Sequence, residues 1–317
     1  MSFFMSADYS LSTKVMEIIY FIIGLLCIYC GVKNLKDKEN PEPVGTFIFW
    51  AVLGVVLALG RWLPSLVSGI LVVVMCIPAI LKKVKKGAVS AATKAETEAT
   101  YEKIGMKIFV PTLSIGMLAV ICAITGMGIG LSALNGGARG VLVAIILLMI
   151  MNRDNKPSTF LNDSERMLST VGPLSMLPML LACLGSVFTA AGVGDVISDL
   201  VSHIIPEGNV NAGIVVYAIG MMLFTMIMGN AYAAITVMTV GIGYPFVLAH
   251  GANPVVIGML ALTCGFCGTL CTPMAANFNT VPVALLDMKK PMGVIKNQVP
   301  VAIIMMVVQI VMMILLK

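Results

Sequence analysis

Long apolar segments separated by short polar ones recur along the whole chain. Many of them have about 17–25 residues, the length that an α-helix needs to cross a bilayer. They lack the strict alternation of polar and apolar residues that is typical of membrane β-strands. The pattern therefore predicts an all-α polytopic membrane protein with about eight transmembrane helices. The uninterrupted spans that we expect are Lys14–Lys33, Val44–Gly60, Pro64–Leu81, Ile108–Thr125, Gly136–Met151, Val171–Leu200 and Asn297–Leu316.

A first polar break, Gly229-Asn230, lies in the middle of the apolar stretch Asn211–Ala249. This stretch can form two full spans joined by a cytoplasmic turn, or one re-entrant helical hairpin with its tip inside the membrane. Other predicted cytoplasmic turns carry Lys or Arg and this one does not, which favours the hairpin. A plain tight turn is the simpler alternative, because Gly-Asn is common in turns.

A second break lies in the segment Pro254–Asp287, which is longer than the roughly 20 residues that a straight membrane helix needs. Pro273 and Pro282 both interrupt helical hydrogen bonding. We therefore expect a discontinuous helix that is unwound around Cys271–Thr280. A proline kink packed between helices is the alternative. Broken helices persist in a bilayer only where they are buried in protein or line a cavity, so two breaks indicate a site near the membrane midplane.

The basic residues separate sharply between the two sides that these spans imply. Of the 20 lysines and arginines, sixteen fall in loops on one side and four on the other. By the positive-inside rule, the side with sixteen is cytoplasmic and both chain termini lie outside. The cytoplasmic set is Lys33, Lys36, Lys38, Lys82, Lys83, Lys85, Lys86, Lys94, Lys103, Lys107, Arg153, Lys156, Arg166, Lys289, Lys290 and Lys296.

Composition agrees with a membrane protein and excludes several classes of function. The chain is 59% hydrophobic and only 11% charged, with a mean hydropathy of +1.02, whereas roughly a quarter of the residues of a soluble domain are charged. The net charge of +5 comes from loop lysines that set topology, so no nucleic-acid partner is expected. Nothing resembles a nucleotide-binding loop. We expect neither an ATP-driven pump nor an enzyme, and no cofactor.

The polar loop 83–107 divides the chain into a front and a back bundle. Residues 1–82 are predicted as an N-terminal transmembrane scaffold, and residues 83–107 as a cytoplasmic polar linker or helix. Residues 108–170 are predicted as further scaffold helices with a cytoplasmic loop. Residues 171–317 are predicted as a transport-type bundle that contains the hairpin (211–249) and the broken helix (254–287).

Eight cysteines all lie inside apolar segments, where they are expected to pack as small apolar residues. Cys264, Cys267 and Cys271 have spacings that can serve metal or redox chemistry. No nearby His or further Cys completes a site, and the adjacent Gly265 and Gly268 are typical of close helix packing. We therefore expect no metal.

The two breaks together supply the candidate site. Carbonyls freed at an unwound segment can coordinate a cation, and amides that open the next half-helix can hold a carboxylate. Asn230 and Asn277 are the residues most suited to polar contacts, because an amide side chain both donates and accepts hydrogen bonds. The predicted binding residues are Gly229, Asn230, Ala231, Thr236, Thr272, Pro273, Asn277, Asn279 and Thr280.

These motifs resemble parts of a known superfamily. Gly229-Asn230-Ala231-Tyr232 is similar to the Ser-Asn-Thr hairpin tip of the ion transporter superfamily, which includes the divalent-anion/sodium symporters and the gluconate and citrate permeases. Cys271-Thr272-Pro273-Met274-Ala275-Ala276-Asn277 resembles the unwound Thr-Pro-Pro-Asn region of the helix that follows. Gly229 and Ala231 replace two hydroxyl residues of that tip, which weakens the case for a sodium site there. The superfamily carries two inverted halves, and the front half Lys14–Met151 shows no equivalent set.

As a whole, the chain resembles a bacterial family of uncharacterised membrane proteins that accompany a second, smaller membrane protein and are linked to 5-oxoproline transport. The resemblance implies a location in the bacterial inner membrane and a smaller partner subunit that could supply the missing half. We expect one subunit of a secondary transporter for a small carboxylate, coupled to Na⁺ or H⁺. The alternatives are a homodimeric organic-anion permease and a non-transport membrane protein, such as an assembly factor or a redox protein that uses Cys264, Cys267 and Cys271.

Overall fold

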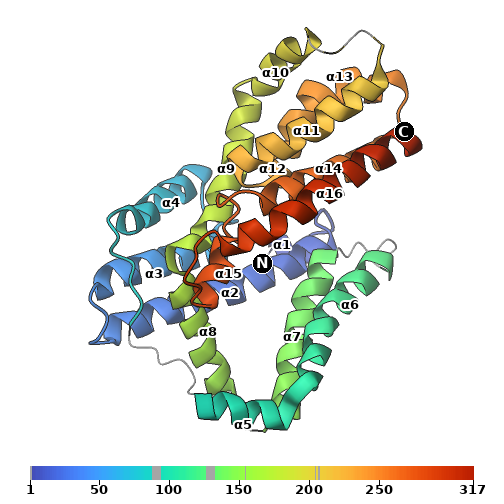
Figure 1. The fold of residues 1–317 in the computed structure, drawn as a ribbon. Coiled ribbons are helices and arrows are strands. Elements are labelled where there is room, and N and C mark those ends of the chain that lie inside the picture. The colour runs from blue at the N-terminus through green and yellow to red at the C-terminus, as the bar shows by residue number, and fades with distance from the viewer. Residues whose placement is uncertain (1, 88–93, 126–132, 154, 204, 206–207) are drawn as a thin grey trace. The chain divides into compact units, whose positions relative to one another are not determined.

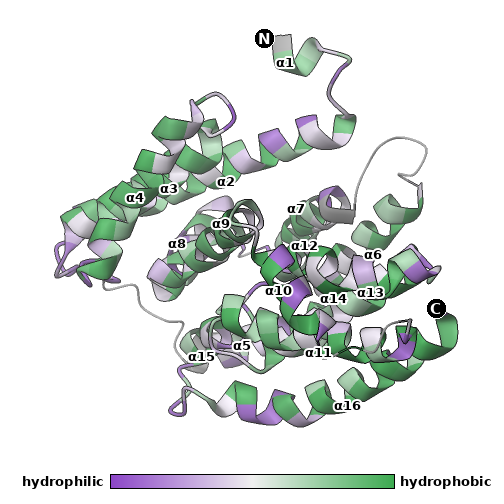
Figure 2. Ribbon diagram, turned by 90° about the horizontal axis from the view of Figure 1, so that it is seen from above, coloured by the Kyte–Doolittle hydropathy of each residue, from purple (hydrophilic) through white to green (hydrophobic). Residues whose placement is uncertain are grey.

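A computed structural model describes residues 2–87, 94–125, 133–153, 155–203, 205 and 208–317. Throughout these residues the secondary structure is helical and no strand occurs, as the apolar pattern predicts. The chain divides into two compact units, Met1–Gly172 (unit 1) and Pro173–Lys317 (unit 2). Figure 2 shows hydrophobic residues along most of α2, α3, α4 and α16, with hydrophilic residues mainly at helix ends and in connecting segments.

Unit 1 consists of helices that pack mainly in neighbouring pairs (Figure 1). The pair α2 and α3 approaches closely at two glycines: a Cβ atom on Gly24 would lie 2.6 Å from the carbonyl oxygen of Gly54. Close backbone approach through small residues is typical of membrane helices. The helices are α1 (Ser2–Met5), α2 (Leu11–Lys36), α3 (Pro43–Leu59), α4 (Ser65–Ile80), α5 (Lys94–Ile104), a 3₁₀ turn (Gly105–Ile108), α6 (Phe109–Thr125), α7 (Ala133–Met151) and α8 (Pro157–Val171).

Unit 2 is built around α11, α14 and α16, which pack against one another (Figure 1). Its core contains Tyr217 and Met221 of α11 and Ile257 and Ala261 of α14, all without exposed surface. The elements are a 3₁₀ turn that begins at the boundary (Gly172–Met176), α9 (Leu177–Ala190), α10 (Val193–Ser202), α11 (Val210–Met228), α12 (Ala231–Met238), a π-helix (Thr239–Gly243), α13 (Tyr244–Phe246), a 3₁₀ turn (Leu248–His250), α14 (Pro254–Leu270), α15 (Thr280–Leu285) and α16 (Gly293–Leu316).

Among the described residues, six helical segments are long and apolar enough to cross a membrane. This supports the predicted membrane character, while the count of about eight spans and the re-entrant form of the hairpin stay predictions. The six are Leu11–Lys36, Thr97–Thr125, Pro157–Ala190, Val210–Met228, Ala231–His250 and Gly293–Leu316. Four shorter apolar helices are Pro43–Leu59, Ser65–Ile80, Asn135–Met151 and Pro254–Leu270.

The predicted single span Val171–Leu200 is wrong in detail. The chain forms α9 and α10 as separate helices, and Gly192 joins them with a positive φ of 69°. That left-handed conformation is accessible to glycine and ends a regular helix. The segment before it also differs, because residues of the predicted cytoplasmic loop fold into α8, whose polar and apolar residues lie on opposite faces.

A buried polar network holds α8 against α2 within unit 1. Glu165 is only 2% exposed, and its Oε1 atom accepts hydrogen bonds from Asn34 Nδ2 and Ser169 Oγ, both at 3.2 Å. Lys33 Nζ lies 3.1 Å from the other carboxylate oxygen, at ion-pair distance but without hydrogen-bond alignment. Asn40 Nδ2 donates to Asn34 Oδ1 at 3.0 Å. The polar groups of this cluster therefore largely satisfy one another.

Candidate site where the hairpin tip meets the broken helix

The tip of the hairpin is a tight turn between α11 and α12. Gly229 ends α11 with a φ of 71°, a left-handed conformation that suits glycine. Asn230 follows as the N-cap of α12, and its Oδ1 atom accepts from the backbone N–H groups of Tyr232 at 2.9 Å and Ala233 at 3.3 Å. This is standard asparagine capping, and it leaves the Nδ2 group of Asn230 without a partner among the described residues.

The broken helix stops at Leu270 and resumes at Thr280. Thr272 and Asn279 hold the unwound segment in place. Thr272 Oγ1 donates to the carbonyl oxygen of Met226, on the hairpin, at 2.9 Å. Asn279 Nδ2 donates to the carbonyl oxygens of Thr269 at 2.8 Å and Thr272 at 2.6 Å. The segment thus has fixed bonds both to the hairpin and across its own gap.

The tip and the unwound segment meet within unit 2. A Cβ atom on Gly229 would lie 2.7 Å from the carbonyl carbon of Met274, so only glycine fits at the tip without displacing the break. A cavity of about 200 Å³ lies beside this contact. It is lined from the hairpin, α9, α14 and the break by Leu181, Gly229, Asn230, Ala231, Tyr232, Phe266, Thr269, Ala276, Asn277 and Phe278.

Four predicted site residues line this cavity: Gly229, Asn230, Ala231 and Asn277. Asn277 is exposed and, like Asn230 Nδ2, takes no hydrogen bond from the described residues. The cavity lining has no carboxylate, lysine, arginine or histidine. Its polar chemistry therefore comes from amide and hydroxyl groups, which can donate to an anion without carrying charge.

The other predicted site residues have different positions. Thr272 and Asn279 are 5% and 1% exposed and are engaged in the bonds that hold the break. Pro273 is exposed but does not line the cavity. Thr280 opens α15, and its hydroxyl group donates to the carbonyl oxygen of Ala276 at 3.1 Å.

Thr236 faces a second hollow, of about 560 Å³, between α9 and α12. Ser186 and Thr189 of α9 supply further hydroxyl groups there, and Asn230 and Tyr232 line both this hollow and the smaller cavity. Sequence reasoning missed Ser186 and Thr189. Their three-residue spacing places two hydroxyl groups on one helix face, which was the available signal.

The cysteine-rich part of α14 has a packing role. Cys264 and Cys267 are buried, and the neighbouring glycines lie against α11. A Cβ atom on Gly268 would come within 2.4 Å of the carbonyl oxygen of Met222, and one on Gly265 within 2.8 Å of Met221. Among the residues that the structure describes, no three His, Cys, Asp or Glu side chains are grouped so that they could hold a metal ion.

Within the described residues, the protein is all-helical and has a membrane-spanning composition. It contains a helical hairpin whose tip contacts the unwound segment of a broken helix. The chain belongs to the family described as "protein of unknown function (DUF979)", whose family model matches residues 17–317. No curated protein and no solved structure matches the chain.

Proposed function

We propose that this protein is one subunit of a secondary transporter for a small carboxylate, coupled to Na⁺ or H⁺. The observation that carries the proposal is the meeting of the hairpin tip and the unwound segment around one cavity. Secondary transporters commonly bind substrate where discontinuous helices meet. The sequence resemblance described above adds 5-oxoproline as the first substrate to test.

The size and lining of the cavity fit a small anion. Drug-sized ligands occupy pockets of roughly 300–1,000 Å³, so a cavity of about 200 Å³ favours a small metabolite. Asn230 Nδ2, the Asn277 amide and the hydroxyl group of Tyr232 can donate hydrogen bonds to a carboxylate. The start of α12 adds a favourable field, because the N-terminal end of a helix carries partial positive charge.

A coupling ion follows from the same chemistry. A carboxylate in a site without a basic side chain is costly to desolvate unless its charge is balanced. A co-bound Na⁺ or a proton on the substrate would provide that balance. In this proposal, the driving ion therefore also makes the uncharged cavity compatible with an anionic substrate.

The proposed partner is a second, smaller membrane protein. An inverted-repeat transporter surrounds its substrate with two related halves, whereas the sequence contains one such set, in residues 171–317. A homodimer in one membrane would normally have both copies in the same orientation. A different chain of opposite orientation is therefore the better source of the other half.

Uptake of labelled 5-oxoproline into proteoliposomes tests the proposal, with the smaller partner present or absent and Na⁺ and the pH gradient varied. Asn277→Ala removes one donor to the substrate, and a hydrogen bond to a charged group contributes roughly 1.5–3 kcal/mol. We expect the apparent affinity to fall about 10- to 100-fold. Unchanged affinity in this variant would place the site elsewhere, and absence of ion-dependent uptake of any small carboxylate would overturn the proposal.

Asn253 provides a matched control for Asn230. Its side chain caps α14 in the same way, accepting from Val255 N at 3.0 Å and Val256 N at 3.4 Å, and it does not line the cavity. Losing either cap should cost about 1 kcal/mol of stability. Only Asn230→Ala should also weaken uptake. Asn230→Ser keeps a capping oxygen but lacks Nδ2, so it should restore stability and leave uptake impaired.

A further inference from the structure

A groove in unit 1, separate from the proposed transport site, combines an apolar channel with a basic mouth. The channel of about 520 Å³ runs between α2 and α7 and reaches α8. It is lined almost entirely by aliphatic residues, among them Ile22, Leu26, Leu142 and Ile145. Along α7 it extends from Ala138 to Ile145, about 10 Å at the helical rise per residue.

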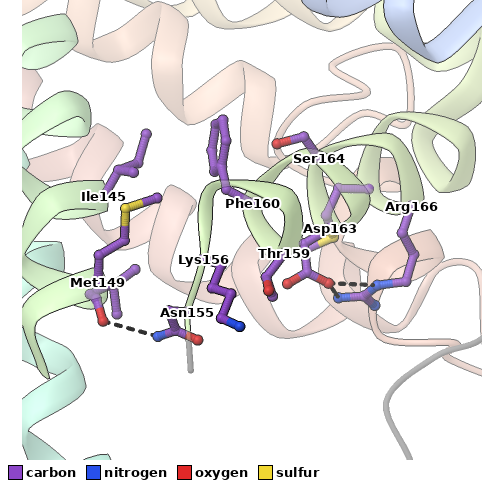
Figure 3. A pocket seen from close by; sticks show the side chains of 11 residues that line it. Ile145, Met149, Asn155, Lys156, Thr159, Phe160, Asp163, Ser164 and Arg166 are labelled. Carbon is purple, nitrogen blue, oxygen red and sulfur yellow. Dashed lines mark hydrogen bonds and ion pairs between the residues drawn. The ribbon is translucent and has the colours of Figure 1, made fainter. Parts of the chain in front are cut away.

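A more polar hollow of about 410 Å³ adjoins one end of this channel. Ile145 and Phe160 line both, so the two form one groove. Figure 3 shows Ile145 and Met149 on one side of the opening and Phe160, Thr159 and Asp163 on the other. Lys156 and Arg166 supply positive charge at this end, which is the end that the distribution of basic residues assigns to the cytoplasmic surface.

Within the described residues, Arg166 pairs with Asp163, which would compete with a phosphate group for the guanidinium. Its Nη2 atom lies 3.2 Å from Asp163 Oδ1, and the Asp163 side chain is 59% exposed. Such exposed ion pairs contribute little, so a phosphate group can replace the carboxylate as the partner of the guanidinium group. Lys156 forms no ion pair within the described residues and remains available.

We propose that this groove binds one anionic phospholipid. The apolar channel between α2 and α7 holds an acyl chain, and Lys156 and Arg166 hold the phosphate of the headgroup. Charge complementarity supports this occupant over a zwitterionic lipid, because basic pockets between membrane helices on the cytoplasmic side recognise anionic headgroups. The proposal is independent of the transport function.

Native mass spectrometry of the full chain in detergent tests the proposal, with phosphatidylglycerol and phosphatidylcholine of identical acyl chains as probes. We expect one molecule of phosphatidylglycerol to bind in preference to phosphatidylcholine. Each basic residue should contribute about five-fold to that preference, so Lys156→Gln should reduce it and the K156Q/R166Q double variant should abolish it. Asp163→Asn should strengthen it.

Two controls separate charge from packing. Lys38→Gln removes an exposed lysine on the same predicted side that does not line the groove, and it should leave the preference unchanged. Leu142→Trp should block the channel and lower occupancy by both lipids, whereas Ile150→Trp, at a 70% exposed position of α7 outside the groove, should not. Equal binding of the two lipids by the unmodified chain, or an undiminished preference in the K156Q/R166Q double variant, would overturn the proposal.

Discussion

Unit 1 and unit 2 both place asparagine side chains among apolar helices, but they satisfy them differently. In unit 1, Asn34 is 1% exposed and bonds to Glu165, Ser169 and Asn40. In unit 2, the Nδ2 group of Asn230 and the side chain of Asn277 are left without partners among the described residues. A network whose donors are all bonded to protein acceptors stabilises the fold, whereas unsatisfied donors beside a cavity are available to a ligand. The first cluster therefore has a structural role, and the second is where we propose that the substrate is recognised.

Breaking the buried network around Glu165 should have the largest effect on stability. Glu165→Ala leaves Asn34 and Ser169 without their shared acceptor and Lys33 without its ion-pair partner. We expect a loss of about 2–4 kcal/mol in the free energy of unfolding. Reversible unfolding of the purified protein in mixed micelles measures this loss. Asp163→Asn breaks an exposed ion pair on the same helix and should cost roughly 0.5 kcal/mol or less. Equal effects of the two variants would show that burial of Glu165 does not matter.

The unwound segment contains one residue whose amide NH₂ group has a structural role like that of Asn34. Asn279→Ala removes the donor to two buried carbonyl oxygens, and we expect a loss of about 2–3 kcal/mol. Asn297→Ala is the matched control, since its exposed side chain donates to the carbonyl oxygen of Gly293 at 3.0 Å; its loss should be about 1 kcal/mol or less. If Asn279→Ala instead left stability intact and abolished uptake, Asn279 would be a ligand-binding residue.

The smallest predicted difference in stability measures the contact between Gly229 at the hairpin tip and Met274 in the unwound segment. Gly229→Ala introduces both a disfavoured left-handed conformation and a clash with Met274. Gly251 has a φ of 92° and nothing within 4 Å of an added Cβ, so Gly251→Ala introduces conformational strain alone, about 1–2 kcal/mol. Unfolding measurements should show Gly229→Ala to be less stable by a further 1 kcal/mol or so. Equal stabilities would mean that the unwound segment at Met274 shifts at little energetic cost to accommodate the added methyl group.

Some features of the fold follow directly from local sequence. The apolar runs predict helices, and the Gly229-Asn230 pair predicts a turn because its chemistry suits a left-handed residue followed by an N-cap. Pro273, which lacks a backbone N–H, predicts the interruption after α14. These features depend on a few adjacent residues, which is why the sequence alone indicates them. The number of membrane spans and the re-entrant form of the hairpin remain predictions.

Other features depend on partners that are distant in sequence. The charged segment that contains Asp163, Glu165 and Arg166 has the composition of a solvated loop. No residue close to it in sequence indicates that the Glu165 carboxylate lies against Asn34 and Lys33 of α2. Asn279 was expected to contact substrate, since residue type shows what a side chain can bond but not which way it points. Local composition therefore indicates a candidate site, which stays a prediction, but it does not separate the residues that line the cavity from those that hold the unwound segment in place.

The bonds made by Thr272 and Asn279 have a consequence for how such a transporter would move. Thr272 links the unwound segment to the hairpin, and Asn279 links the two edges of the gap. Bending at either break would disrupt these hydrogen bonds, so the tip and the interrupted helix are coupled mechanically. In the proposed transport cycle, alternating access would then arise from displacement of this assembly as a rigid body, with substrate carried in a cavity whose walls keep their shape.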